Sequence, residues 1–186
     1  MSEKVHLVLG GARSGKSRFA EQAAIESGKE VVYIATATVY DDEMQARINR
    51  HIDDRPDHWL TVEEPLRLAE TLKQYAAKDK CLLVDCLTLW LTNVLMAEQS
   101  SKSEQAACDE EKIKSLAEYK EELLAVLSTL PGQVILVSNE VGQGIVPMGE
   151  LTRRFVDEAG WLHQDIAGIA QQVTLVVAGL PMQLKS

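Results

Sequence analysis

The sequence predicts a three-layer α/β domain in which helices cover both faces of a mostly parallel central sheet. Two observations carry this prediction. Five short runs are apolar and rich in β-branched residues, and the segments between them hold helix formers at helical spacing. This alternation is typical of α/β domains. The runs are also apolar at nearly every position, as strands are when both faces of a sheet are covered.

In the N-terminal part of the chain, Val5–Leu9 and Val31–Ala35 are predicted strands. Ser17–Ser27 is a predicted helix, because Gly28 provides the usual C-terminal stop. Asp41–Ile52 is a second predicted helix, since the two aspartates at its start suit the positive end of the helix dipole.

The middle of the chain begins with a predicted helix over Glu64–Ala77, whose proline lies in the first turn, where proline is tolerated. Cys81–Val84 is the third predicted strand. Glu98–Ser103 is the best candidate for a loop, because it is polar and follows a long apolar stretch.

Towards the C-terminus, Ser103–Thr129 is a predicted helix that a Pro-Gly pair closes. Val134–Val137 and Val173–Ala178 are predicted strands. Glu150–Gln171 is a predicted helix between them, although two glycines weaken the prediction that it is continuous.

Size and charge limit the possible functions. We expect one domain that spans residues 1–186. The hydrophobic fraction of 46% and charged fraction of 25% exclude a disordered or fibrous chain. The net charge is −9, and Lys and Arg form no dense run. Because nucleic-acid binding depends on basic patches, we expect no nucleic-acid partner.

Cysteine usage and hydropathy favour a cytoplasmic protein. The odd set Cys81, Cys86 and Cys108 contains no C-x-x-C pair, which favours reduced thiols over a disulfide framework. The N-terminus does not fit a signal peptide. The apolar stretch Leu82–Ala97 is short and interrupted by polar residues, so we expect no transmembrane segment.

A phosphate-binding motif lies between the first predicted strand and the first predicted helix. The pattern G-x-x-x-x-G-K-[ST] is met by Gly10, Gly11, Ala12, Arg13, Ser14, Gly15, Lys16 and Ser17. In such a P-loop the glycines let backbone amides turn toward phosphate oxygens, and the helix adds its positive end. We expect Lys16 to reach the β- and γ-phosphates as a catalytic residue and the Ser17 hydroxyl to ligate Mg²⁺.

Two acidic residues follow predicted strands. Asp85 comes directly after Cys81–Val84, and a P-loop enzyme uses an acid at such a position to hold the shell of its Mg²⁺. The alternative role for Asp85 is a helix N-cap. Glu140 follows Val134–Val137. It can orient a hydroxyl, contact the metal or cap a turn, and the sequence leaves these roles open.

The motif alone does not distinguish phosphoryl transfer, hydrolysis and nucleotidyl transfer. A switch GTPase is disfavoured, because no Asn/Thr-Lys-x-Asp element follows the strands. Its nearest analogue, Ser138-Asn139-Glu140, lacks the lysine.

His51 shares one face of the helix predicted over Asp41–Ile52 with Met44 and Ile48. Spacing alone favours a neutral histidine in the core. The alternative is a nucleophile, because a neutral imidazole can attack phosphorus and form a phosphoramidate.

An ordered set of motifs resembles the bifunctional adenosylcobinamide kinase / adenosylcobinamide-phosphate guanylyltransferase family. The resemblance covers most of the chain apart from roughly Ala97–Glu118. The matching residues are Gly10–Ser17, Tyr33–Ala37, Asp41–Met44, Arg47, Ile48, His51, Arg55, Pro56, Trp59, Thr61, Glu63, Asn139–Gly142 and Gly144–Pro147.

The resemblance implies a two-step role in cobalamin assembly, with ATP and GTP as substrates and the P-loop NTPase fold. The hydroxyl of adenosylcobinamide is first phosphorylated. GTP then donates GMP to His51, pyrophosphate leaves, and the corrinoid phosphate takes the GMP to give adenosylcobinamide-GDP. The resemblance also implies a homotrimer with active sites near the subunit boundaries. Beyond the P-loop, the GTP contacts that it implies are Thr36, Ala37, Thr38, Ile52, Asp53, Asp54, Arg55, Glu63 and Asp85.

The sequence departs from the family pattern after the histidine. Ile52 stands where a basic residue is expected, and Asp54 stands where a smaller residue would be more permissive. Arg50 and Arg55 remain as nearby cations.

Two rival functions follow from the same P-loop. A kinase without guanylyltransferase activity would carry no covalent nucleotide on His51. A regulatory or assembly ATPase would turn over without a corrinoid acceptor, whereas a transferase would depend on one.

Overall fold

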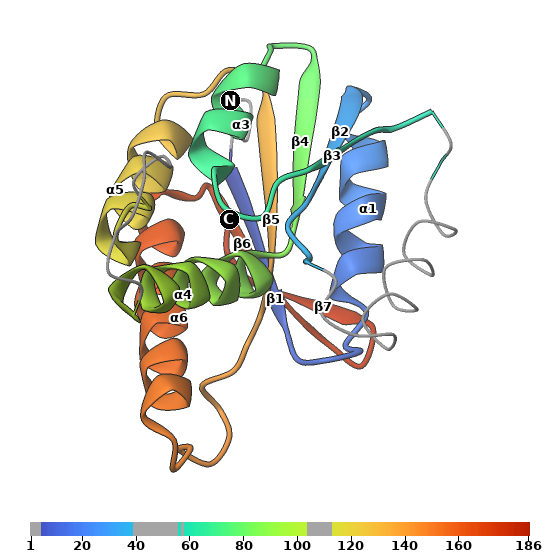
Figure 1. Cartoon of the computed structure of the whole chain (residues 1–186). Helices are drawn as coiled ribbons and strands as arrows, with labels where there is room; N and C mark the ends of the chain where they lie inside the picture. The colour runs from blue at the N-terminus through green and yellow to red at the C-terminus, as the bar shows by residue number, and fades with distance from the viewer. Residues whose placement is uncertain (1–4, 39–55, 57, 104–112) are drawn as a thin grey trace.

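The computed structural model of the chain is a seven-stranded sheet between two layers of helices (Figure 1). It describes residues 5–38, 56, 58–103 and 113–186. The predicted three-layer α/β architecture is confirmed. The strands are β1 (Val5–Gly10), β2 (Glu30–Ala35), β3 (Leu60–Glu63), β4 (Lys80–Asp85), β5 (Gln133–Asn139), β6 (Gln172–Val177) and β7 (Leu180–Lys185).

The strand order is β3-β2-β4-β5-β1-β6-β7. Each neighbouring pair is parallel except β6 and β7, which are antiparallel. Strand β5 therefore lies between β1, which leads into the P-loop, and β4, which ends at Asp85. The carboxyl ends of these parallel strands meet at one edge of the sheet, where α/β proteins bind their ligands.

The described helices divide unequally between the two faces. Helix α1 covers one face, and the other four lie on the opposite face (Figure 1). Buried side chains form two clusters, a small one under α1 and a large one under the other helices. The helices are α1 (Lys16–Glu26), α3 (Leu68–Tyr75), α4 (Leu87–Ser103), α5 (Leu116–Leu127) and α6 (Glu150–Ile169).

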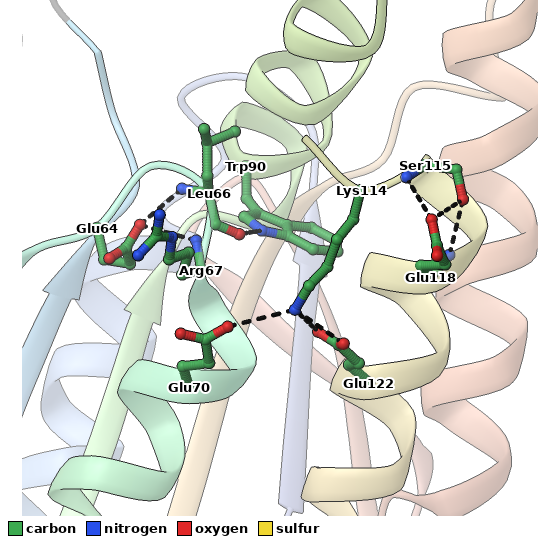
Figure 2. Close-up of polar contacts among 9 residues, drawn as sticks. All are labelled: Glu64, Leu66, Arg67, Glu70, Trp90, Lys114, Ser115, Glu118 and Glu122. Atoms are coloured by element: carbon green, nitrogen blue, oxygen red, sulfur yellow. Dashed lines mark hydrogen bonds and ion pairs between the residues drawn. The ribbon is translucent and has the colours of Figure 1, made fainter. Parts of the chain in front are cut away.

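Polar contacts fix the ends of helices on the face of the sheet that α3, α4, α5 and α6 cover (Figure 2). Ser115 and Glu118 form a reciprocal capping box that starts α5. Lys114 joins α3 to α5, because its Nζ lies 3.3 Å from Glu70 Oε1 and 2.8 Å from Glu122 Oε2. The buried Trp90 of α4 donates to the Leu66 carbonyl at 2.8 Å, which anchors the segment before α3.

Two sequence predictions on this face are wrong. Ser103–Thr129 is not one helix: residues 113–115 are not helical, because the Ser115 cap starts α5 at Leu116. Residues 104–112 lie outside the described part. Glu98–Ser103 is not a loop but the end of α4. The Glu98 carboxylate is held 2.6 Å from the Arg154 guanidinium of α6, an ion pair between helices that the local sequence does not reveal.

The remaining differences concern helix ends and edge strands. The helix predicted over Glu64–Ala77 starts only at Leu68, because the Glu64 carboxylate accepts from two backbone amides in a turn before it. Helix α6 is continuous through both glycines, since its buried face packs against the sheet. Strands β3 and β7 were not predicted. The predicted helix Asp41–Ile52 lies outside the described residues, and within them no helix is long and apolar enough to cross a membrane.

Candidate active site

The P-loop joins the end of β1 to the start of α1, as the motif predicts. The Ser14 amide donates to the Gly11 carbonyl at 3.2 Å, which closes the loop. Gly15 has φ of 94°, a conformation that glycine adopts at little cost. A Cβ on Gly10 would lie 2.4 Å from Ser14 Oγ and 2.6 Å from the Val176 carbonyl oxygen, so the loop leaves no room for a larger residue there.

Lys16 folds back over this loop. Its Nζ donates to the Gly11 carbonyl at 3.2 Å, and the residue is only 9% exposed. Burial lowers the pKa of Lys16, while the nearby Cys86 and Asp85 act to raise it. No side chain caps the N-terminus of α1. An ammonium group and uncapped helix amides together suit a bound polyphosphate.

The turn between β6 and β7 braces the P-loop from outside. The Gly179 amide donates to the Ser14 carbonyl at 2.7 Å. Ala178 and Gly179 both have positive φ, as in a tight two-residue hairpin. Sequence reasoning missed this support, although Gly179 between two apolar runs was a usable signal for a hairpin.

Asp85 lies at the same sheet edge, at the end of β4. Its Oδ2 accepts a 2.9 Å hydrogen bond from the Tyr33 hydroxyl, and its carbonyl accepts from the Thr36 amide at 3.2 Å. The carboxylate also acts on the pKa of Lys16. The fold therefore brings Lys16 and Asp85, which are far apart in the sequence, into one electrostatic neighbourhood.

Thr36 follows β2 and is completely buried. Its hydroxyl donates to the Cys86 carbonyl at 2.7 Å and accepts from the Cys86 amide at 2.9 Å. Asn93 of α4 donates to the Thr36 carbonyl at 2.7 Å. Thr36 thus joins the ends of β2 and β4, while Ala37 and Thr38 after it are partly exposed.

Of the other predicted site residues beyond the P-loop, Glu63 and Glu140 lie at the same edge of the sheet and the rest lie outside the described residues. Glu63 is exposed at the end of β3 and pairs in register with Ala35, so it lies at the same edge. The Glu140 amide donates to the Gly10 carbonyl at 3.0 Å, but its carboxylate accepts from the Gly142 amide. The predicted residues His51, Ile52, Asp53, Asp54 and Arg55 lie outside the described residues.

Ser17 supplies a hydroxyl in the first turn of α1, directly after the P-loop, and Asp85 supplies a carboxylate at the end of β4 that acts on Lys16. Magnesium prefers such oxygen ligands and usually keeps several waters, so it needs few ligands from the protein. This donor set therefore fits Mg²⁺ held partly by substrate phosphates. Within the described part of the chain, no cluster of three or more His, Cys, Asp or Glu side chains could hold a metal by itself.

Known proteins of one family resemble this chain over nearly its whole length. A family model described as "Cobinamide kinase / cobinamide phosphate guanyltransferase" matches residues 6–184. The bifunctional adenosylcobalamin biosynthesis protein CobP of Pseudomonas aeruginosa is 58% identical over 179 residues, which is 96% of each chain. The protein CobU of Salmonella typhimurium, with the same description, is 43% identical over 96% of this chain and 98% of its own.

Among the solved structures that resemble the fold are two proteins of secretion and flagellar systems. The ATPase EscN of an enteropathogenic Escherichia coli secretion system matches with TM-score 0.53 and 10% identity, over 95% of this chain and 43% of that chain. The flagellar accessory protein FlaH of Methanocaldococcus jannaschii matches with TM-score 0.50 and 11% identity, over 98% and 78% of the two chains. At such identities the likeness extends to the fold alone.

Proposed function

The chain belongs to the cobinamide kinase / cobinamide phosphate guanyltransferase family, and we propose that it phosphorylates adenosylcobinamide and then transfers GMP from GTP to the product. The supporting observation is that similarity to bifunctional relatives runs through nearly the whole chain. The P-loop and Asp85, at one sheet edge, suit the phosphoryl-transfer half of this activity.

In the kinase step, the P-loop amides and the N-terminus of α1 hold the triphosphate, and Lys16 supplies positive charge to its terminal phosphates. The hydroxyl oxygen of the corrinoid forms a bond to the γ-phosphorus as the bond to the bridging oxygen breaks. The nucleoside diphosphate leaves with that electron pair, and the hydroxyl proton passes to solvent. Mg²⁺ held by Ser17 and Asp85 would neutralise charge on the phosphates.

In the guanylyltransfer step, we assign the nucleophile to His51. Its imidazole nitrogen forms a bond to the α-phosphorus of GTP, and pyrophosphate leaves with the electron pair of the broken P–O bond. A phosphate oxygen of the corrinoid then attacks the same phosphorus. This attack releases the histidine and gives adenosylcobinamide-GDP.

The family resemblance supplies the other parts of the proposal. Thr36–Thr38, Ile52–Arg55 and Glu63 are the expected GTP contacts outside the P-loop. We also expect a cytoplasmic homotrimer.

Labelled GTP separates the proposed function from its rivals. The enzyme is incubated with GTP labelled at the α- or the γ-phosphate, denatured, and assayed for bound label. We expect the α-label to remain, acid-labile and base-stable as in a phosphoramidate, and the γ-label to be absent. The covalent route is wrong if no α-label remains, and a kinase without guanylyltransferase activity follows if GMP is also not transferred to the corrinoid phosphate.

Two variants assign the labelled residue. His51→Ala should lose the α-label and GMP transfer but keep substantial kinase activity, because the kinase step uses no protein nucleophile. His58→Ala is the matched control, since His58 is exposed and is the nearest other imidazole in the sequence. Label on the His51→Ala protein would contradict the assignment.

A further inference from the structure

Asn139 is the last residue of β5, the strand between the P-loop strand and the strand that ends at Asp85. In the sheet register, Asn139 lies directly opposite Gly10, the first residue of the P-loop. The backbone N–H of Asn139 donates to Thr88 Oγ1 at 3.4 Å. The backbone of Asn139 is therefore held beside the phosphate site.

The alternation of strand side chains assigns Asn139 to the same face of the sheet as Lys16. In β5, Ile135 and Val137 pack in the cluster under α1, whereas Val134 and Leu136 pack under the other helices. Because successive side chains point to opposite faces, Asn139 continues the row that faces α1.

The residues before and after Asn139, Ser138 and Glu140, lie on the opposite face of the sheet, near α6. The Ser138 hydroxyl lies 2.7 Å from Nε2 of His163 on α6. The charge of Glu140 acts on the pKa of the same histidine. Of these three consecutive residues, Asn139 is therefore the one whose side chain lies on the face of the sheet that α1 and Lys16 cover.

The alternation of side chains along β4 likewise assigns Asp85 to the face of the sheet that α1 covers. Leu83 and Cys81, the alternate residues before Asp85 in β4, belong to the cluster under α1. Tyr33, which donates to Asp85, belongs to it as well. Asn139 and Asp85 thus end adjacent strands on one face.

The side-chain oxygen of Asn139 is buried and has no hydrogen-bond partner. Within the described residues, the buried side-chain polar atoms without a partner are Asn139 Oδ1 and Ser14 Oγ. Both flank Gly10, one across the strand pair and one within the loop. A buried unsatisfied polar group destabilises the folded state, and a hydrogen-bond donor that arrives with the substrate would remove this penalty.

We propose that Asn139 Oδ1 accepts a hydrogen bond from the corrinoid hydroxyl that is to be phosphorylated. The bond would aim the hydroxyl oxygen at the γ-phosphorus. A carbonyl oxygen repels phosphate oxygens but accepts from an O–H group, so the hydroxyl is the substrate group that it suits. The amide takes no proton, and the bonds that form and break are those of the kinase step. This role rests on the proposed function and assigns to the kinase step a residue that guanylyltransfer does not need.

The substitution Asn139→Leu tests the role, because leucine is of similar size but cannot accept a hydrogen bond. Relief of the unsatisfied oxygen should raise the thermal midpoint by about 2–4 °C. The kcat for phosphorylation of adenosylcobinamide should fall about 100-fold, as expected when a reacting group loses its orientation. Uptake of α-label from GTP should be unchanged. Asn139→Ala should show the same split between the two half-reactions.

Ser138→Ala is the matched control at the end of β5. It removes a buried hydrogen bond on the opposite face, so it should lower the thermal midpoint and leave both half-reactions in place. The role is overturned if Asn139→Leu loses both half-reactions together, loses neither, or is destabilised as Ser138→Ala is. Failure of the unmutated enzyme to phosphorylate adenosylcobinamide would instead overturn the proposed function, and the role of Asn139 with it.

Discussion

The Tyr33 hydroxyl donates a 2.9 Å hydrogen bond to Oδ2 of Asp85, so a tyrosine of β2 orients the acid at the end of β4. Tyr33 is buried, and its strand pairs in register with β4, with Ala35 opposite Asp85. One carboxylate oxygen is thereby engaged in the sheet. The bond fixes the orientation of the Asp85 carboxylate, which lies near enough to Lys16 for its charge to act to raise the pKa of that lysine.

Tyr33→Phe should weaken magnesium use without removing the acid. The change deletes the hydrogen bond to Asp85 and keeps the ring in the core, at a cost of about 1–2 kcal/mol in the free energy of unfolding. We expect the Mg²⁺ concentration for half-maximal kinase activity to rise several-fold. A metal titration checks this, with Tyr75→Phe on the opposite side of the sheet as the control. An unchanged titration would mean that Tyr33 serves packing alone.

Asp85→Asn should have a larger effect on the same titration. The change removes a negative charge that a divalent cation would use and keeps the size of the side chain. Mg²⁺-dependent turnover should fall more than nucleotide binding measured without metal. If the dependence on Mg²⁺ does not change, Asp85 is a structural residue at the strand end and not a metal ligand.

Gly10→Ala should destabilise the protein, and Gly11→Ala should not. A Cβ on Gly10 meets a backbone carbonyl oxygen of Val176 at 2.6 Å, which cannot move without shifting β6, whereas a Cβ on Gly11 meets nothing within 4 Å. Overpacking of this kind costs about 1–3 kcal/mol. Urea unfolding of both variants measures the difference. Equal stability of the two would contradict the close approach seen at Gly10.

The sequence predicted those elements whose local pattern agrees with their tertiary environment. Strand β1, the P-loop and α1 were placed within a residue or two, because an apolar run, glycines and a helix stop all lie in one short segment. The start of α5 was missed, although Ser115 and Glu118 form a capping-box pattern that can be read directly.

Other features depend on contacts that no local pattern contains. Strand β7 is exposed along its whole length and is recognisable only from its pairing with β6. The sequence alone does not decide whether Glu140 orients a hydroxyl, contacts a metal or caps a turn, because the answer depends on how β5 packs in the fold. Only the register of β5 and the bond between Ser138 and His163 reveal which side chains of that strand end face α6.

Stability should fall as the pH drops below about 6.5, because buried histidines resist protonation. His6 is buried, with Nε2 2.8 Å from Thr174 Oγ1, and burial lowers its pKa from 6.5 to about 4. Burial also lowers the pKa of His163. Between pH 6.5 and about 4, His6 is protonated in the unfolded chain and neutral in the folded chain, so acid favours unfolding.

Urea unfolding at several pH values between 7 and 4 measures this loss. The His6→Gln variant should lose less stability over that range, because glutamine does not titrate and can still reach Thr174. Parallel curves for the two proteins would show that His6 contributes nothing to the acid sensitivity.

Lys16→Ala should cripple both half-reactions while the protein stays folded. The described residues contain one P-loop, and its lysine is buried against the Gly11 carbonyl, so both triphosphate reactions depend on the same charge. Loss of such electrostatic stabilisation costs about 100-fold or more in rate. Burial disfavours the charged ammonium and lowers the pKa of Lys16, so its removal should offset part of the stability that is lost with the buried side chain and its bond to Gly11, and the thermal midpoint should change little.

Kinase turnover, uptake of α-label and thermal unfolding are compared for Lys16→Ala and Lys73→Ala. Lys73 is an exposed residue of α3, which lies on the face of the sheet away from α1, and its loss should leave all three measurements unchanged. If Lys16→Ala kept guanylyltransfer at the wild-type rate while losing kinase activity, a second triphosphate site would be needed. A single P-loop that serves both steps requires the two activities to fall together.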